Sequence, residues 1–184
     1  MEGALKLQKV LKNYKNQFAI EVTLNTPDAY KIIETLIKEE HDSWVGAGTV
    51  TTLEEAQKVI ELGVKFILGP TLFSKEIIEY CEKNNVMSIP GAFSPSEIKE
   101  QFNYGANIVK VFPANTLGPK FFKDVQAPLG ELNLMAVGGI NSNNFNEYFD
   151  NKVKYVGIGA GLFEGQSLDD LSENEIVHYL EKYI

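Results

Sequence analysis

The pattern of apolar and polar residues alternates between two periods along the chain. Short apolar runs rich in valine, isoleucine and phenylalanine are separated by longer segments in which apolar residues recur every three to four positions. Runs of the first kind predict buried β-strands, and segments of the second kind predict amphipathic helices. Seven strands are predicted, and their starts lie roughly 21 to 26 residues apart: Ala19, Trp44, Phe66, Met87, Ile108, Leu134 and Tyr155.

Local signals mark the helices around these strands. A helix is predicted over residues 4–15, ahead of the first strand. Several later helices begin with a serine or threonine that is followed three residues on by glutamate. This is a capping box, in which each side chain accepts a hydrogen bond from the backbone N–H of the other residue. The predicted boxes are Thr52/Glu55, Ser94/Glu97 and Ser172/Glu175.

A regular alternation of strand and helix indicates a parallel sheet built from βα units. The strands are apolar along their length rather than on alternate residues, which suits a sheet covered on both faces. We therefore expect a (β/α)8 barrel of the TIM type, with its active site at the carboxyl ends of the strands. A doubly wound open sheet is the alternative, but the chain lacks the G-x-G-x-x-G fingerprint of such folds. No linker or low-complexity tract interrupts the pattern, so residues 1–184 are expected to form a single barrel domain.

Composition narrows the possible functions. The net charge of −8 and the isoelectric point of about 4.9 argue against binding to nucleic acid or to anionic membranes. The sequence shows neither a signal peptide nor an apolar run long enough to cross a bilayer. Its one cysteine, Cys81, excludes a disulfide framework within the chain, and a cytoplasmic protein is expected. All 17 basic residues are lysines, so an anion site would use lysine or backbone N–H groups.

Lys110 stands in the middle of the apolar segment 108–114, which proline ends as a strand. Burying an ammonium group without a partner costs several kcal/mol, so this lysine needs a carboxylate, a bound anion or a chemical task. Burial lowers the pKa of a lysine and frees its amine to attack a carbonyl carbon, as in Schiff-base chemistry. The alternative is a lysine at a sheet edge whose ammonium group extends to water.

Glu21 is a second ionisable residue within an apolar strand, between Ile20 and Val22. A carboxylate there is costly unless it faces a polar interior or meets a cation. A glutamate at a strand edge is the alternative for this position. Because Lys110 carries the opposite charge on another predicted strand, one shared site explains both residues better than two separate causes.

Small residues end three of the predicted strands. Thr49 follows Gly46-Ala47-Gly48, where the lack of large side chains would let a ligand approach the backbone, although a turn threonine is an equal alternative. Paired glycines at 138–139 and spaced glycines at 157–161 end the last two strands. In barrels the loops there commonly bind a phosphate through N–H groups; ordinary turn glycines are the alternative. No cluster has the spacing of metal ligands, and we expect neither a metal nor another cofactor.

Taken together, these segments resemble the 2-keto-3-deoxy-6-phosphogluconate aldolases, class I enzymes of bacterial type that include the 4-hydroxy-2-oxoglutarate aldolases. The resemblance covers roughly Ile20 to Phe163. It rests on the order of Glu21–Leu24, Gly46–Val50, Ile89–Gly91, Ser94–Glu97, Lys110–Ala114 and Gly138–Ile140. It implies a (β/α)8 barrel, often trimeric, that cleaves a 2-keto-4-hydroxy acid to pyruvate and an aldehyde, either glyceraldehyde 3-phosphate or glyoxylate.

The resemblance also implies roles for individual residues. Lys110 would form the Schiff base, and Glu21 would act as the general acid and base. Thr49 would contact the carboxylate of pyruvate, and Phe112 would pack beside the imine. The remaining substrate-binding positions, of which the glycine loops would hold the phosphate, are Asn25, Pro70, Gly138, Gly139, Gly159, Ala160 and Gly161.

The chain departs from the pattern of this family at several of these positions. The family has an arginine where this chain has Asn25, a threonine where it has Val137, and a serine where it has Gly161. Each change removes a hydrogen-bond donor toward an anion, so we expect weak binding of carboxylate and phosphate. The end of the third strand reads Gly69-Pro70-Thr71, where the family usually has S-P-G.

A further departure concerns the barrel wall. The family has a strand before the first helix, whereas only Met1, Glu2 and Gly3 precede the helical pattern here. The chain therefore has about seven recognisable strands where closure normally needs eight. Either the barrel has a gap or something else fills it, and an open edge would expose unpaired N–H and C=O groups. The resemblance and this edge together lead us to expect a homotrimer.

Other functions compete with a class I aldolase that acts on a small keto acid. The first is a catalytically impaired relative that binds a keto acid or a phosphorylated metabolite. Another is a phosphate-binding barrel, such as a ribulose-phosphate epimerase or a thiamine-phosphate synthase. The epimerase needs a set of metal ligands that the sequence lacks, and the combination of Lys110 with Glu21 favours an aldolase over both barrels.

Overall fold

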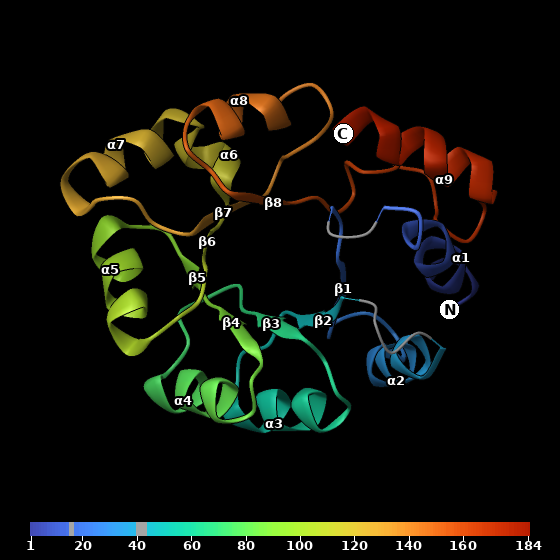
Figure 1. Cartoon of the computed structure of the whole chain (residues 1–184), viewed down its shortest axis with the longest axis horizontal. Helices are drawn as coiled ribbons and strands as arrows, with labels where there is room; N and C mark the ends of the chain where they lie inside the picture. The colour runs from blue at the N-terminus through green and yellow to red at the C-terminus, as the bar shows by residue number, and fades with distance from the viewer. Residues whose placement is uncertain (15–16, 40–43) are drawn as a thin grey trace.

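The computed structural model describes residues 1–14, 17–39 and 44–184 (Figure 1). Lys15, the last residue of the helix predicted over 4–15, lies outside the described residues. The α-helices are α1 (Glu2–Leu11), α2 (Ala29–Glu39), α3 (Leu53–Glu61), α4 (Lys75–Lys83), α5 (Pro95–Tyr104), α6 (Ala114–Leu117), α7 (Lys120–Leu129), α8 (Phe145–Asp150) and α9 (Glu173–Leu180). The strands are β1 (Ile20–Thr23), β2 (Val45–Gly48), β3 (Phe66–Leu68), β4 (Met87–Ile89), β5 (Gly91–Ala92), β6 (Val109–Val111), β7 (Leu134–Val137) and β8 (Tyr155–Gly157). A 3-10 turn, η1 (Glu181–Tyr183), follows α9.

The strands form two parallel sheets of four strands, in the orders β1-β2-β3-β4 and β5-β6-β7-β8. All seven predicted strands are present, and the fourth is divided at Pro90 into β4 and β5. Proline has no N–H to donate to a ladder, so regular pairing is interrupted there. On either side of the break β4 pairs with β3 and β5 pairs with β6, so this one segment joins the two sheets.

The helices lie outside the curved wall of strands, as in a barrel of the TIM type (Figure 1). Among the described residues no ladder joins β8 to β1, and the wall is open between these two strands. The described residues therefore form the predicted α/β barrel, in which seven βα units follow one another. Each of the two edge strands, β1 and β8, has a partner strand on one side only.

The two faces of the strands pack against different partners. In β3, Ile67 belongs to the large core between strands and helices, whereas Phe66 and Leu68 belong to a small cluster inside the barrel. Ile89 and Ile108 complete the buried part of that inner cluster. Side chains alternate between the two faces of a strand. In each of the remaining strands, the residues on either side of one that packs against the helices therefore face the inside of the barrel.

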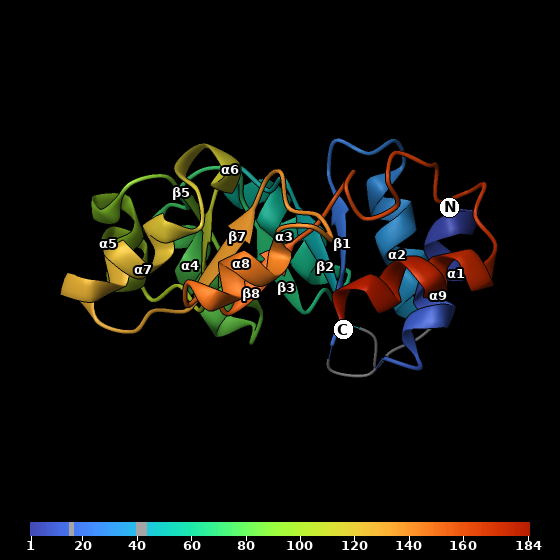
Figure 2. The same cartoon turned by 90° about the horizontal axis from the view of Figure 1, so that it is seen from above.

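The first and last helices pack together beside the open wall. Figure 2 shows α1, α2 and α9 grouped at one end of the molecule, together with both chain termini. The Gly3 N–H donates to Asp169 Oδ1 at 2.6 Å, and Lys9 pairs with Glu173 at 2.6 Å. Val10 of α1 lies in one buried cluster with Ile176 of α9. Contacts between the two ends of the chain thus cover the region next to β1.

The predicted capping boxes of α3, α5 and α9 are all present, with both reciprocal hydrogen bonds in each. Each box fixes the point at which the chain leaves the upper rim of the barrel and enters a helix. In the part of the chain that the structure describes, none of the helices combines the length and apolar character needed to span a membrane.

Candidate active site

Lys110 is the central residue of β6 and lies almost entirely inside the barrel. Its two neighbours, Val109 and Val111, are fully buried against the outer helices, so the lysine points inward on the same face as Ile108. Only 5% of the Lys110 surface is exposed. Burial lowers the pKa of its amine, because a low-polarity environment disfavours the ammonium form.

Glu21 is the second residue of β1 and also points inward, because Ile20 and Val22 pack against the helices. Protein surrounds most of its carboxylate, and this burial raises the pKa. The residue as a whole nevertheless remains exposed to solvent.

The two ionisable groups influence each other across the barrel. The positive charge of Lys110 lowers the pKa of Glu21, and the negative charge of Glu21 raises the pKa of Lys110, in each case against the larger effect of burial. They form no direct ion pair among the contacts of the described residues. The space between an amine and a carboxylate held in this way is suited to a substrate whose carbonyl carbon is attacked by the amine.

Thr49 and Asn25 meet at the carboxyl ends of β1 and β2. Thr49 adopts a left-handed backbone conformation with φ of 60°, which is uncommon for a threonine and is often found at functional sites. Its hydroxyl donates to Asn25 Oδ1 over a long distance of 3.5 Å. The hydroxyls of Thr23 and Thr26 lie 3.0 Å apart in the same region. The hydrogen-bonding groups here are neutral, in agreement with the lack of arginine.

Phe112 lies close to Lys110, and Pro70 lies close to β5, the strand that pairs with β6. The Lys110 Nζ is 5.1 Å from the centre of the Phe112 ring, within the range of a cation–π contact. Phe112 is 37% exposed, so its ring forms part of the open surface next to the amine. Pro70 follows β3, and its carbonyl lies against Gly91, the residue that pairs with Lys110 in the ladder between β5 and β6.

The glycines after β7 and β8 come together at one side of the barrel mouth. Gly138 and Gly139 are both left-handed, with φ of 104° and 72°. Any side chain at Gly161 would meet the Ile140 carbonyl at 2.7 Å, which shows how closely the two loops approach. A side chain at Gly159 would meet nothing within 4 Å, so this loop borders open space next to Ala160.

Two side chains of the protein lie over Gly46 and Gly48. A side chain on Gly46 would overlap the ring of Phe66, and one on Gly48 would overlap the carboxylate of Glu21. These glycines accommodate other side chains of the protein. The neighbour of a strand glycine is set by strand register and by the opposite wall, neither of which a single segment encodes.

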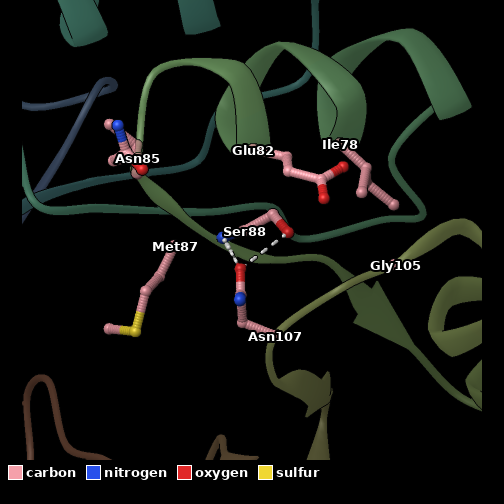
Figure 3. Close-up of a pocket in the computed structure, with 8 residues that line it drawn as sticks. Ile78, Glu82, Asn85, Met87, Ser88, Gly105 and Asn107 are labelled. Carbon is pink, nitrogen blue, oxygen red and sulfur yellow. Dashed lines mark hydrogen bonds between the residues drawn. The ribbon is translucent and has the colours of Figure 1, made fainter.

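A hollow of about 310 Å³ lies at the opposite end of the barrel (Figure 3). It is formed where α4 and α5 end and where β4 begins, with Glu82, Asn85 and Met87 in its lining. Two of its polar residues bond to each other, since Asn107 Oδ1 accepts from both the Ser88 N–H and the Ser88 hydroxyl. The hollow is therefore distinct from the site that contains Lys110 and Glu21.

The geometry supports covalent chemistry by a lysine assisted by a carboxylate. Among residues 1–14, 17–39 and 44–184, no group of histidine, cysteine, aspartate or glutamate side chains is arranged to hold a metal ion. Cys81 is buried in the core, and burial raises the pKa of its thiol to about 12, so it is not a candidate nucleophile. Lys110 is thus the inward-facing residue best suited to attack a carbonyl group.

Comparison with known proteins gives one consistent result. Residues 3–178 match the model of the KDPG and KHG aldolase family. A 2-dehydro-3-deoxy-phosphogluconate aldolase from Treponema pallidum is 35% identical over 150 residues, which cover 81% of this chain and 71% of that protein. A probable 2-dehydro-3-deoxy-6-phosphogalactonate aldolase from Rhizobium meliloti is 32% identical over 161 residues, with coverage of 86% and 76%. The solved KDPG aldolase from Legionella pneumophila, with pyruvate captured as a covalent carbinolamine, is 32% identical with a TM-score of 0.86, covering 97% of this chain and 86% of that one.

Proposed function

The chain belongs to the KDPG and KHG aldolase family, and we propose that it carries out the aldolase reaction through an imine on Lys110. It is a class I aldolase, an aldehyde-lyase that cleaves a 2-keto-4-hydroxy acid to pyruvate and an aldehyde. The observation that carries the assignment of Lys110 is its position: an inward-facing lysine, 5% exposed, with a lowered pKa.

In the proposed mechanism the neutral amine of Lys110 attacks the C2 carbonyl of the substrate. Glu21 in its protonated form donates a proton to the hydroxyl of the resulting carbinolamine, which leaves as water, and a protonated imine and the Glu21 carboxylate remain. Glu21 then removes the proton of the C4 hydroxyl, the C3–C4 bond breaks, and its electron pair moves into the imine to form an enamine. The aldehyde leaves, the enamine takes up a proton at C3, and water hydrolyses the pyruvate imine to release pyruvate and regenerate the lysine.

The other predicted site residues are assigned to the two ends of the substrate. Thr49 and Asn25 would bind the carboxylate of the keto acid with neutral donors, and Phe112 would pack beside the imine. Pro70 would border the same space, next to Gly91. The far end of the substrate would lie against the glycine loops, where backbone N–H groups are the available donors for a phosphate. These loops contain Gly138, Gly139, Gly159, Ala160 and Gly161.

We also propose a cytoplasmic homotrimer that binds no nucleic acid or membrane. The negative net charge of −8 and the single cysteine, which is buried, support this part of the proposal. Unpaired edges at β1 and β8 give the chain a reason to associate. Light scattering at micromolar concentration tests the assembly, and a well-behaved monomer would contradict it.

Reductive trapping tests the central step. Incubation with pyruvate and sodium borohydride should add a reduced pyruvyl group to Lys110, located by peptide mass spectrometry. Lys110→Ala should prevent this addition and abolish turnover, whereas Lys65→Ala, which alters an exposed lysine ahead of β3, should preserve both. Addition to a different lysine, or no addition to the wild-type protein, would contradict the assignment.

The impaired-relative alternative makes a different prediction for the same protein. A chain that only binds a keto acid would show ligand-dependent protection from unfolding without cleavage of any 2-keto-4-hydroxy acid. Measurement of pyruvate release from 2-keto-3-deoxy-6-phosphogluconate and from 4-hydroxy-2-oxoglutarate separates the two outcomes. It also shows whether the aldehyde product is phosphorylated.

A further inference from the structure

Gly48 lies beside the Glu21 side chain on the inward face of the wall. In the ladder between β1 and β2, Glu21 pairs with Gly46 and Thr23 pairs with Gly48, so Gly48 is the diagonal neighbour of Glu21. A Cβ atom on Gly48 would overlap Glu21 Oε1 and would lie 2.6 Å from its Cδ and 2.8 Å from its Cγ. The Glu21 side chain therefore extends across the gap between the strands and lies over the backbone of β2.

The backbone does not explain why this position is a glycine. Seven glycines of the described chain have the positive φ that other residues avoid, and Gly48 is not one of them. The three atoms that a side chain at Gly48 would first meet all belong to Glu21. Position 48 therefore needs a residue without a side chain because the Glu21 carboxylate occupies the space.

We propose that Gly48 is a positioning residue of the aldolase reaction, which by its lack of a side chain sets where the Glu21 carboxylate lies relative to Lys110. This inference rests on the proposed role of Glu21 in proton transfer. If a side chain at position 48 displaces the carboxylate, the amine of Lys110 remains in place while the proton acceptor moves. Binding of the keto acid and the capacity to form an imine are then retained, and the steps that need proton transfer become slow.

Gly48→Ala is the direct test. The overlap falls on the end of a flexible side chain, so the variant is expected to fold with Glu21 rotated away. Because a misplacement of about 1 Å can reduce the rate by about 10²-fold, we expect kcat to fall by about 10- to 100-fold. KM should change by less than about threefold, since the change affects proton transfer rather than uniform binding.

Gly46→Ala is the matched control, because Gly46 lies on the same strand and the same inward face. Its side chain would overlap the ring of Phe66, which is buried in the inner cluster and has no comparable freedom to move. Gly46→Ala should therefore lower the melting temperature more than Gly48→Ala does, without a selective loss of kcat in the folded protein. A strand that simply needs small residues would give the same result for both variants.

A double-mutant cycle with Glu21→Ala separates the inference from the proposed function. If Gly48 acts through Glu21, Gly48→Ala should not further lower the residual kcat that Glu21→Ala leaves, and it should not change the melting temperature in that background. Three outcomes would overturn the inference. The first is a Gly48→Ala effect that persists in the Glu21→Ala background, and the second is an unchanged kcat in Gly48→Ala alone. The third is misfolding of Gly48→Ala that Glu21→Ala does not relieve. An unchanged kcat in Glu21→Ala itself would instead overturn the role proposed for Glu21.

Discussion

The two strands that carry the central ionisable residues have very different surroundings. β6 has a partner strand on each side, and Lys110 is 5% exposed at its centre. β1 has a partner on one side only, and Glu21 faces inward but remains exposed to solvent. The closed side of the barrel therefore removes the lysine from water, whereas the open side leaves the glutamate within its reach.

This difference suits the two chemical roles. A lysine must be neutral to attack a carbonyl group, and a dry environment favours the neutral amine. A group that transfers protons in both directions must exchange them, and contact with water allows this exchange. The opening between β8 and β1 thus lies beside Glu21, the residue whose proposed role is compatible with contact with water.

Glu21→Gln removes the carboxylate of the open side and preserves its size. Turnover should fall by about 10²- to 10⁴-fold, the usual contribution of general acid–base catalysis. Trapping of pyruvate on Lys110 by borohydride should still be detectable, because the amine on the closed side is intact. Steady-state release of pyruvate measures the first effect, and intact mass spectrometry measures the second. Equal turnover in variant and wild type would show that another group moves the protons.

Leu68→Ala and Tyr155→Ala compare the packing of the two sides directly. Leu68 is 1% exposed in the inner cluster, and its truncation should reduce the free energy of unfolding by about 2–5 kcal/mol. Tyr155 is on the edge strand β8 and is 44% exposed, so its truncation should cost about 1 kcal/mol or less. Urea unfolding at matched protein concentration gives both values. Equal losses would mean that the open side is packed as tightly as the closed one, for example by a partner subunit.

Asn25→Arg adds a positive charge to the open side at the end of β1. A charged hydrogen bond to the keto-acid carboxylate would contribute about 1.5–3 kcal/mol, so KM should fall by about tenfold or more. Asn103→Arg, at an exposed position of α5, adds the same charge far from the strand end and serves as the control. An unchanged or increased KM in Asn25→Arg would show that the carboxylate is bound elsewhere.

Lys110→Met tests the closed side through the pH dependence of stability. The pKa of Lys110 is lowered by burial, so between that lowered value and the ordinary value of 10.5 the unfolded chain binds more protons than the folded chain. The stability of the wild type therefore rises with pH through this window, and the variant lacks this contribution. We expect the variant to be more stable below the window and the difference to shrink as pH approaches 10.5. Urea unfolding of both proteins over pH 7–10.5 measures it, and a constant difference would contradict the lowered pKa.

Much of the fold was predictable because its signals are local. Apolar runs and their spacing identified every strand, and the three capping boxes identified helix starts, since both depend on residues that are close in sequence. The division of the fourth strand at Pro90 was not predicted. A proline shows that a ladder is interrupted, but only the position of β6 shows that pairing resumes beyond it.

The sequence predicted those residues of the candidate site whose type is unusual for the segment in which they occur. Lys110 and Glu21 stood out as ionisable residues in apolar strands, and the structure places both on the inward face. Three features of the site were not predictable: the position of the Glu21 side chain over Gly48, the contact of Thr49 with Asn25, and the exposure of Glu21. All three depend on which strands are neighbours and on the absence of one neighbour beside β1.

The contact between α1 and α9 has a consequence for the order in which the molecule opens. It joins residues about as far apart in sequence as the chain allows, such as Gly3 with Asp169, and the loop that it closes is correspondingly costly in entropy. Because a long loop must close before such contacts can form, we expect them to form late in folding and to separate early in local unfolding. Hydrogen exchange should therefore be faster in these two terminal helices than in β6. We therefore expect the strand of Glu21 to lie beside the part of the protein that unfolds first, and the strand of Lys110 to lie within the part that unfolds last.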